Sequence, residues 1–267
     1  MAKLSVLILA KNEEKNIADC IKSVAFADEV VVIDDFSEDT TAAIAEGLGA
    51  RVVQRAMKGN WGEQQTFAIE QASYDWVFFI DADERASKRL AAKVREVVAT
   101  DDRRYAYNIA RLNYFWEQPL RHGGWFPDYG MHLLPREGVY VTGFVHPQIH
   151  HAYEEEHLLK QEHIIHYPYR DWEHYFNKLN LYTTLAAKKM KEQGKSAYIW
   201  DFILHPAWAS FRMYVLKSGW RDGRVGYGQG MSSCSEKEGE AEGFVHGVLL
   251  GWLGRGSVFF CFSDPLL

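Results

Sequence analysis

The sequence predicts an α/β protein with a mostly parallel sheet and helices on both of its faces. Short apolar runs of strand length recur through the first hundred residues. Between them lie segments whose apolar residues repeat at helical spacing. Strands that alternate with helices in this way build parallel, doubly wound sheets. With 267 residues, 47% of them apolar, the chain is long enough for one sizeable core.

The elements are expected in the following order. Residues 4–9 (LSVLIL) form a continuous apolar run, as expected for a strand buried on both faces. Ile17, Cys20, Ile21 and Val24 then follow helical spacing. Further strands are predicted at 29–34, 51–54 and 76–80, and further helices at 40–48, 61–73 and 87–99.

The regular alternation of predicted strands and helices ends at about residue 105. Residues 105–115 (YAYNIARLNYF) predict a strand, and short strands are expected near 138–142 and 159–165. The stretch 118–130 between them is rich in Gly, Pro and Trp. Loops of this composition commonly carry binding sites, so we expect part of the site here.

Helical spacing returns at 171–193, and a second helix is predicted at 197–218. A Gly/Ser/Glu-rich run at 227–243 predicts a flexible linker, followed by an apolar tail to residue 267. Neither apolar piece of the tail reaches the roughly 20 residues of a membrane helix.

Composition argues against several classes of function. The formal charge of −6, a pI near 6.0 and the lack of a basic run disfavour a nucleic-acid partner. Cys20, Cys234 and Cys261 lie far apart without a CxxC pair, which favours a reducing compartment. The apolar run near the N-terminus meets Lys11 at once and is interpreted as a strand rather than a signal peptide, which predicts a cytoplasmic protein.

The strongest chemical signal is Asp81-Ala82-Asp83-Glu84, directly after the apolar strand WVFFI. Carboxylates at the carboxyl end of a parallel strand lie where α/β sheets bind ligands. Oxygen ligands suit Mg²⁺ or Mn²⁺, which needs one or two carboxylates when substrate phosphates fill other positions. A surface turn or helix cap is the alternative for an isolated pair of this kind, and its position after a buried strand favours the metal site.

Two other strand ends are expected to face the same crevice. Asp34 and Asp35 close the strand 29–34, and such carboxylates can accept hydrogen bonds from a uracil ring N–H or a ribose hydroxyl. Asp39, a few residues on, is better placed to cap the next helix. Lys11 and Glu13 follow the first strand and complete the set, although alone they indicate only a helix start.

The segments LSVLILAKNEEKNI, ADEVVVIDDFSEDTT and DWVFFIDADE resemble those of family 2 glycosyltransferases with the GT-A fold. The later segments GGWFPDYGMHLLPR and IIHYPYRDWEHYFNKLNLYT, with Val-His at 145–146, are similar to the bacterial lipopolysaccharide-core β-glucosyltransferases. The resemblance spans about residues 3–225. It departs from that subgroup at Gln65, usually basic, at His132, usually Arg, and at Pro147-Gln148, where an acidic residue is usual.

The resemblance implies an inverting hexosyltransferase that uses a nucleoside-diphosphate sugar, such as a UDP-sugar, and a divalent metal. It assigns Asp83 as metal ligand and places Asp81 near the ribose or metal, with Gln65 near the donor phosphates. The implied domains are a GT-A catalytic domain at 1–170, with a nucleotide-sugar half at 1–104 and an acceptor half at 105–170, then a helical extension at 171–226 and the linker and tail at 227–267. The implied acceptor is a glycan or lipid-linked oligosaccharide at the inner face of the cytoplasmic membrane, which the aromatic and basic segment 197–224 would contact. A helix packed on the catalytic domain is the alternative for this segment.

Displacement at the sugar carbon needs a base for the acceptor hydroxyl. Asp128 is the candidate, since it follows Pro127 in the region that enzymes of this fold use for acceptors, although a turn role after Pro remains open.

Other functions stay open with less support. A nucleotidyltransferase also places carboxylates at strand ends, but its Gly-rich basic loop is replaced by AKNEEKNI. A non-catalytic nucleotide-sugar-binding protein is the other alternative. The histidines between 146 and 174 do not follow zinc-site spacing.

Overall fold

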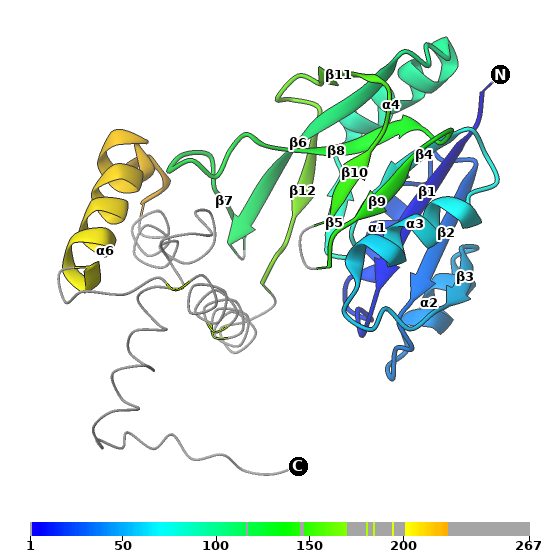
Figure 1. Ribbon diagram of the computed structural model, residues 1–267, viewed down its shortest axis with the longest axis horizontal. Helices are drawn as coiled ribbons and strands as arrows, with labels where there is room; N and C mark the ends of the chain where they lie inside the picture. The colour runs from blue at the N-terminus through cyan, green and yellow to red at the C-terminus, as the bar shows by residue number, and fades with distance from the viewer. Residues whose placement is uncertain are drawn as a thin grey trace. The chain divides into compact units, whose positions relative to one another are not determined.

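A computed structural model describes residues 2–115, 117–144, 147–169 and 201–223, together with residues 180, 184 and 194 (Figure 1). The described residues form two compact units. The first contains residues 2–121 and 125–168, and the second contains residues 122–124 with the described residues from 169 onward. The predicted α/β architecture is confirmed in the first unit.

Four parallel strands form the first half of the sheet, in the order β3-β2-β1-β4. They are β1 (Leu4–Ala10), β2 (Glu29–Asp34), β3 (Arg51–Gln54) and β4 (Trp76–Phe79). Ala10 pairs with Asp34, and Leu7 pairs with Phe79. Because the strands are parallel, their carboxyl ends meet at one edge of the sheet, where the predicted site residues follow them.

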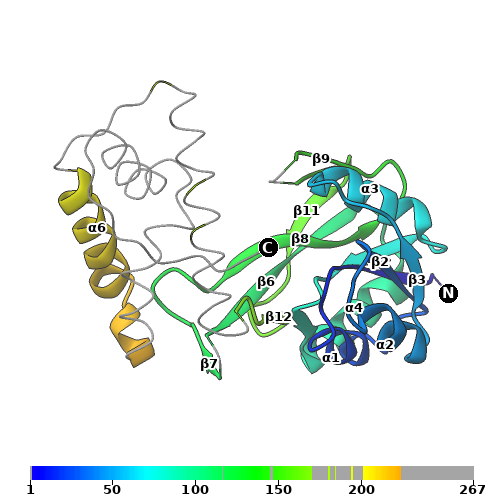
Figure 2. The same ribbon diagram turned by 90° about the horizontal axis from the view of Figure 1, so that it is seen from below.

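The sheet continues through antiparallel strands. β8 (Asp128–Pro135) pairs with β4 on one side and with β6 (Tyr105–Phe115) on the other, and β6 and β8 run side by side (Figure 2). β12 (His163–His166) then pairs with β6, and β5 (Glu84–Ala86) pairs with β12. No strand was predicted at β8 or β5. Their pairing brings the amino end of β8 to the edge where β4 ends.

Shorter strands surround this sheet. β7 (Gln118–Pro119) and β11 (Glu154–His157) pair with β6. β9 (Tyr140–Thr142) and β10 (Gln148–His150) pair with each other. The strands predicted near 138–142 and 159–165 correspond to β9 and β12, whereas β7, β10 and β11 were not predicted.

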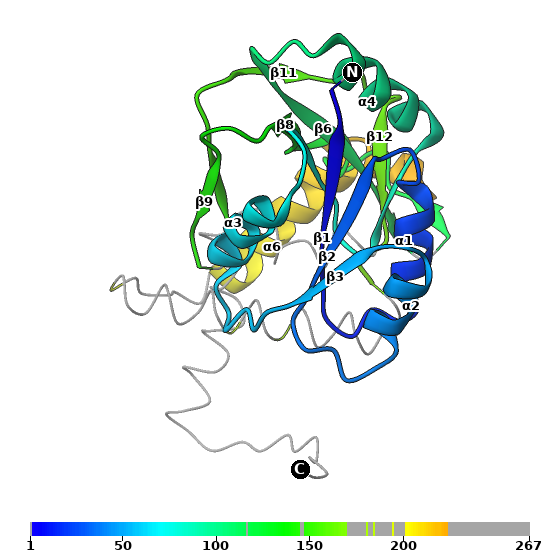
Figure 3. The same ribbon diagram turned by 90° about the vertical axis from the view of Figure 1, so that its right-hand side faces the viewer.

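Helices cover both faces of the sheet, as predicted (Figure 3). The apolar side chains of α1 (Ile17–Ser23), α2 (Thr41–Gly47) and α4 (Lys88–Thr100) pack on one face, and those of α3 (Trp61–Gln71) pack on the other. Side chains alternate along β4, so that Phe78 belongs to the first layer and Val77 to the second.

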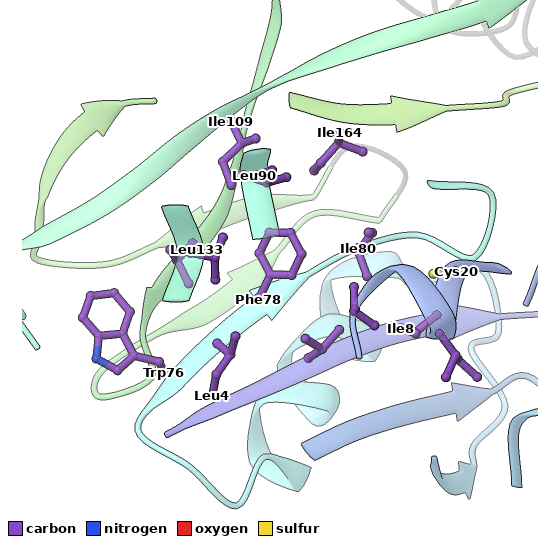
Figure 4. Close-up of a cluster of buried hydrophobic side chains, with 14 of the residues drawn as sticks. Leu4, Ile8, Cys20, Trp76, Phe78, Ile80, Leu90, Ile109, Leu133 and Ile164 are labelled. Carbon is purple, nitrogen blue, oxygen red and sulfur yellow. The ribbon is translucent and has the colours of Figure 1, made fainter. Parts of the chain in front are cut away.

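The first layer holds the largest buried side chains (Figure 4). Trp76 and Phe78 of β4 are fully buried and share it with Leu90 of α4 and Cys20 of α1. Burial of an aromatic or aliphatic side chain of this size stabilises the fold by roughly 1.5–3 kcal/mol. The apolar core is therefore built on β4, the strand that leads into Asp81 and Asp83.

In the second unit, α6 (Asp201–Phe211) is followed by a π-helical turn (Arg212–Leu216) and a 3₁₀ turn (Gly219–Asp222). α6 and the π-helical turn fall within the helix predicted at 197–218, and the 3₁₀ turn lies just beyond it. The helix predicted at 171–193 and the linker and tail predicted at 227–267 lie outside the described residues. Among the residues that are described, no helix is both long and apolar enough to cross a membrane.

Candidate active site

The acidic motif after β4 alternates between solvent and core. The side chain of Asp81 is exposed and that of Asp83 is 22% exposed, whereas Ala82 and Glu84 are buried. Glu84 is turned inward at the start of β5, and its Oε2 accepts a hydrogen bond from the Asp81 backbone N–H at 3.0 Å. Asp81 and Asp83 therefore present their carboxylates outward. The Glu84 carboxylate holds the backbone of the motif through its hydrogen bond with the Asp81 N–H.

Cys20 lies beneath this turn. Its Sγ donates a hydrogen bond to the Asp81 carbonyl at 3.3 Å, and its side chain is fully buried. Burial raises the pKa of this thiol far above its ordinary value. Cys20 is therefore a packing and anchoring residue rather than a nucleophile.

Arg111 of β6 connects the motif to Asp128. Its guanidinium lies 3.1 Å from Asp128 Oδ2 and 3.7 Å from Glu84 Oε1. Arg111 and Asp128 are also directly paired in the β6–β8 ladder. The predicted base is thus brought next to the acidic motif by strand pairing.

The buried Glu84 carboxyl is electrostatically unusual. Burial and the neighbouring Asp81 carboxylate raise its pKa well above the ordinary value, against the opposing effect of His166 and Arg111. Arg111 offsets part of the cost of this buried acid, so removal of the guanidinium would leave Glu84 without that compensation.

His166 faces Asp83 from the end of β12. Its Nε2 lies 3.5 Å from Asp83 Oδ2, and its Nδ1 lies 2.6 Å from Asn113 Oδ1. Burial favours the neutral ring, but the Asp83 and Glu84 carboxylates dominate and raise the pKa of His166 above its ordinary value. The structure thus places a basic side chain opposite the predicted metal ligand. His146 lies outside the described residues.

A cavity of about 400 Å³ lies beside the motif. Its lining includes Gln65, Asp81, Glu84, Asn108, Arg111 and His132. Among the described residues, Gln65 Oε1, Glu84 Oε1 and Arg111 Nε are buried without a hydrogen-bond partner. Such atoms are uncommon in folded proteins, and their gathering around one cavity indicates a place where water or a ligand is bound.

His132 is part of this cavity, and the sequence identified it only as a departure from the subgroup. It is 8% exposed, and its Nδ1 lies 2.8 Å from the Phe79 carbonyl oxygen. Because a carbonyl only accepts, Nδ1 carries the proton in the neutral ring. Burial, with the nearby Arg111, lowers the pKa of His132 to about 4. The side chain is therefore uncharged near neutral pH and cannot replace the charge of an arginine.

At the end of β2, the Asp35 side chain is 14% exposed. Its Oδ2 lies 2.9 Å from Lys11 Nζ, and its Oδ1 accepts a hydrogen bond from Met57 N at 2.9 Å. Although partial burial opposes the shift, these hydrogen bonds lower the pKa of Asp35. The residue is an ionised acceptor near neutral pH.

Asp34 is fully buried, unlike its neighbour. Its Oδ2 accepts hydrogen bonds from Ser37 N at 3.0 Å and Gln54 Nε2 at 3.3 Å. These contacts brace the loop after β2. The structure therefore separates the pair Asp34-Asp35 into a bracing residue and a surface residue.

Glu13 also makes structural contacts. Its backbone carbonyl accepts from Asn16 N and Ile17 N at the start of α1, and its Oε2 accepts from Asn16 Nδ2 at 2.7 Å. Asp39 Oδ1 accepts a hydrogen bond from Thr41 N, the first residue of α2, but the N-cap of this helix is Thr40 rather than Asp39.

The donor set suits a hard divalent cation. Among the described residues, no group of three or more His, Cys, Asp or Glu side chains is arranged to hold a metal. Mg²⁺ and Mn²⁺ bound through substrate phosphates need only one or two protein carboxylates. Asp81 and Asp83, both reaching outward from one short turn, fit that requirement.

Residues 5–149 match the family model described as Glycosyl transferase family 2. The lipopolysaccharide core biosynthesis glycosyltransferase LpsC of Rhizobium meliloti (strain 1021) is 29% identical over 245 residues, 86% of this chain and 87% of the relative. An uncharacterized glycosyltransferase of Rickettsia felis is 30% identical over 230 residues, 81% of this chain and 80% of the relative.

Among solved structures, glucosyl-3-phosphoglycerate synthase from Mycobacterium tuberculosis, in complex with Mn²⁺, UDP and glucosyl-3-phosphoglycerate, aligns with a TM-score of 0.40 at 22% identity. The alignment covers 54% of this chain and 61% of that one.

Proposed function

Since the chain belongs to glycosyl transferase family 2, we propose that it transfers a hexose, with inversion, from a nucleoside-diphosphate sugar to a glycan acceptor. The observation that carries this proposal is the cavity beside β4, where Asp81, Glu84 and Arg111 line a space with several unsatisfied polar atoms. Charged groups converging on a recessed space are typical of binding sites for polar substrates.

Asp83, with Asp81, would hold Mg²⁺ or Mn²⁺, since these are the outward carboxylates of the motif. When bound, the cation would act as a Lewis acid on the leaving diphosphate. Gln65, on α3, lines the cavity and supplies an amide toward the donor phosphates.

Asp128 is the proposed base for the acceptor hydroxyl. It is 28% exposed, so solvent and substrate can reach it, and Arg111 fixes its position. A general base must lie within hydrogen-bonding reach of the proton that it removes. Its place at the start of β8, joined through Arg111 to the acidic motif, satisfies the positional part of this requirement.

The acceptor proposed is the core of lipopolysaccharide, and the sugar is glucose. This step rests on the Rhizobium relative, whose name assigns it to lipopolysaccharide core biosynthesis, and on the subgroup motifs in the sequence. The reaction would then take place at the cytoplasmic face of the membrane, where a lipid-linked acceptor is displayed.

Nucleotide-sugar binding tests the proposal directly. A ligand that binds only the folded state at 100 times its Kd stabilises it by about 2.7 kcal/mol. In a thermal-shift comparison of UDP-, GDP- and dTDP-sugars, we expect one donor family to raise the melting temperature, and to do so more strongly with Mn²⁺. A flat response to all three families, with and without metal, would contradict the proposed function.

Asp35→Asn is expected to raise the KM for the donor about tenfold, since a hydrogen bond to a charged group contributes about 1.5–3 kcal/mol. Contacts to base or ribose are equal in ground and transition states, so kcat should change little. Asp34→Asn is not an equivalent test, because Asp34 is buried and braces the loop. Asp102→Asn, on an exposed carboxylate paired with Arg104, is the control. If Asp35→Asn lowers kcat and leaves the KM for the donor unchanged, Asp35 does not contribute to donor binding.

Peripheral membrane contact is proposed for the second unit. Leu204, Trp208 and Trp220 are each more than half exposed. Lys217 and Arg221 accompany them, and aromatic and basic side chains together suit a headgroup layer. We expect salt-sensitive co-sedimentation with phosphatidylglycerol vesicles but not with phosphatidylcholine vesicles. The pair of substitutions Trp208→Ala and Trp220→Ala should abolish it, and equal sedimentation with both vesicle types would reject this contact.

A further inference from the structure

We propose that a basic groove beside the acidic motif binds the phosphate or carboxylate groups of an acidic saccharide acceptor. The basic groove consists of two cavities that share Lys88 as a lining residue. The inference rests on the proposed transferase function, because it names the acceptor class. It concerns residues that do not line the cavity beside β4.

The first cavity measures about 660 Å³ and lies between α1, β5 and the first turns of α4. Lys15, Lys22, Arg85 and Lys88 line it, and Asp19 is the one carboxylate among its lining residues. Arg85 follows Glu84 directly in the chain, so the cavity begins where the acidic motif ends.

The second cavity measures about 450 Å³ and also has Lys88 among its lining residues. Arg89, Arg121, Lys160 and His163 line it, and no carboxylate does. The two cavities together are lined by seven Lys and Arg side chains against one acid. In a chain with a net charge of −6, such a concentration of positive charge does not follow from composition.

Four of these cations are not explained by ion pairs, whereas Lys22 lies 3.9 Å from Asp19 Oδ1. Lys15, Lys88, Arg89 and Lys160 have no carboxylate oxygen within 4.0 Å in the described part of the chain. Elsewhere on the surface, Arg51, Arg103 and Arg104 are all paired.

Helix stability does not explain them either. Lys88 and Arg89 occupy the first turn of α4, which contains no acidic residue. The helix dipole disfavours cations at this end. Two cations in an unfavourable position, both lining cavities that are rich in other cations, are accounted for by an anionic ligand that neutralises them.

Aromatic rings favour a saccharide as the carrier of the anionic groups. Tyr167 lines the first cavity and Phe126 lines the second, and both are partly exposed. Aromatic faces pack against the C–H surfaces of sugars. The Tyr167 N–H also donates to the Asp83 carbonyl at 3.0 Å, which places this ring beside the motif. One acceptor chain can therefore occupy the groove and still approach the site of transfer.

The test uses the full-length protein with UDP and Mn²⁺ at saturation, so that the donor site is filled. Isothermal titration calorimetry compares glucose 1,6-bisphosphate with glucose for the parent, Lys88→Glu and Arg95→Glu. Lys88 lines both cavities, whereas Arg95 is an exposed cation on the same helix that lines neither. We expect the parent and Arg95→Glu to bind the bisphosphate and not glucose, and Lys88→Glu to bind it at least about tenfold more weakly.

Misfolding of a variant is distinguished from loss of binding by its melting temperature. A carboxylate in the first turn of α4 is favourable to the helix dipole, so Lys88→Glu should melt no lower than the parent. Equal loss in both variants, or no bisphosphate binding by the parent, overturns the inference. If Lys88→Glu loses binding to phosphatidylglycerol vesicles but keeps binding to the bisphosphate, the ligand is a lipid headgroup and the inference is overturned. Failure of the parent to bind UDP with Mn²⁺ would instead count against the proposed function.

Discussion

Asp83→Ala is expected to reduce sugar transfer by about 10³-fold or more, because it removes the proposed ligand of the cation that would stabilise the leaving diphosphate. The fold should persist, since the Asp83 side chain is partly exposed and contributes no apolar surface to the core. Transfer is measured with a radiolabelled donor over a range of Mn²⁺ concentrations, and folding is measured by the melting temperature of the apo protein.

Asp128→Asn provides the matched comparison for this variant. Both substitutions remove one partly exposed carboxylate of the same site. If Asp128 is the base, its loss lowers kcat but preserves the Mn²⁺-dependent thermal shift by the donor, whereas Asp83→Ala loses both. Parental transfer rates in Asp83→Ala would show that the metal is held elsewhere or is not needed.

Arg111→Met is expected to have the largest effect on stability. Methionine retains much of the side-chain volume but removes the charge that lies 3.7 Å from the buried Glu84. Breaking a buried pair in this way costs about 3–5 kcal/mol, and the partial exposure of Arg111 argues for the lower end of that range. Urea unfolding of the apo protein measures the loss. Transfer should fall as well, since Asp128 loses the partner that positions it.

A second substitution identifies the cause of that loss. If the cost comes from an uncompensated Glu84 carboxylate, the double variant Glu84→Gln, Arg111→Met should recover a large part of the lost stability. If the double variant is no more stable than Arg111→Met, lost packing around the guanidinium stem is responsible and the electrostatic account is wrong.

The sequence predicted the parallel half of the fold well because its signals are local. β1, β2 and β4 are short, mainly apolar runs that end at charged residues, Lys11, Asp34 and Asp81, and a helical period follows each. Since parallel strands share one carboxyl edge, the position of Lys11, Asp35, Asp81 and Asp83 at that edge could be predicted without knowledge of side-chain contacts.

The antiparallel half was harder to predict because its signals are tertiary. The first half of β8, Asp128 to Met131, borders the cavity and is only partly buried, so it lacks a clear apolar pattern. The four residues of β11 are all exposed. Glu84 and Asp34 are buried by elements distant in sequence, which local pattern does not reveal. Arg111 did carry a signal that was not used: it is the single charged residue in the strand YAYNIARLNYF.

The position of β8 has a consequence for how the first unit can move. β8 is hydrogen-bonded to β4 on one side and to β6 on the other, so the segments on either side of residue 105 belong to one sheet. A hinge between them would require these ladders to break. Rearrangement on substrate binding is therefore expected in connections outside the ladder, such as residues 120–127. Insertions or substitutions in those connections would leave the β4–β8 and β6–β8 ladders unchanged. The position of Asp128 relative to the acidic motif would then be retained while the connections vary.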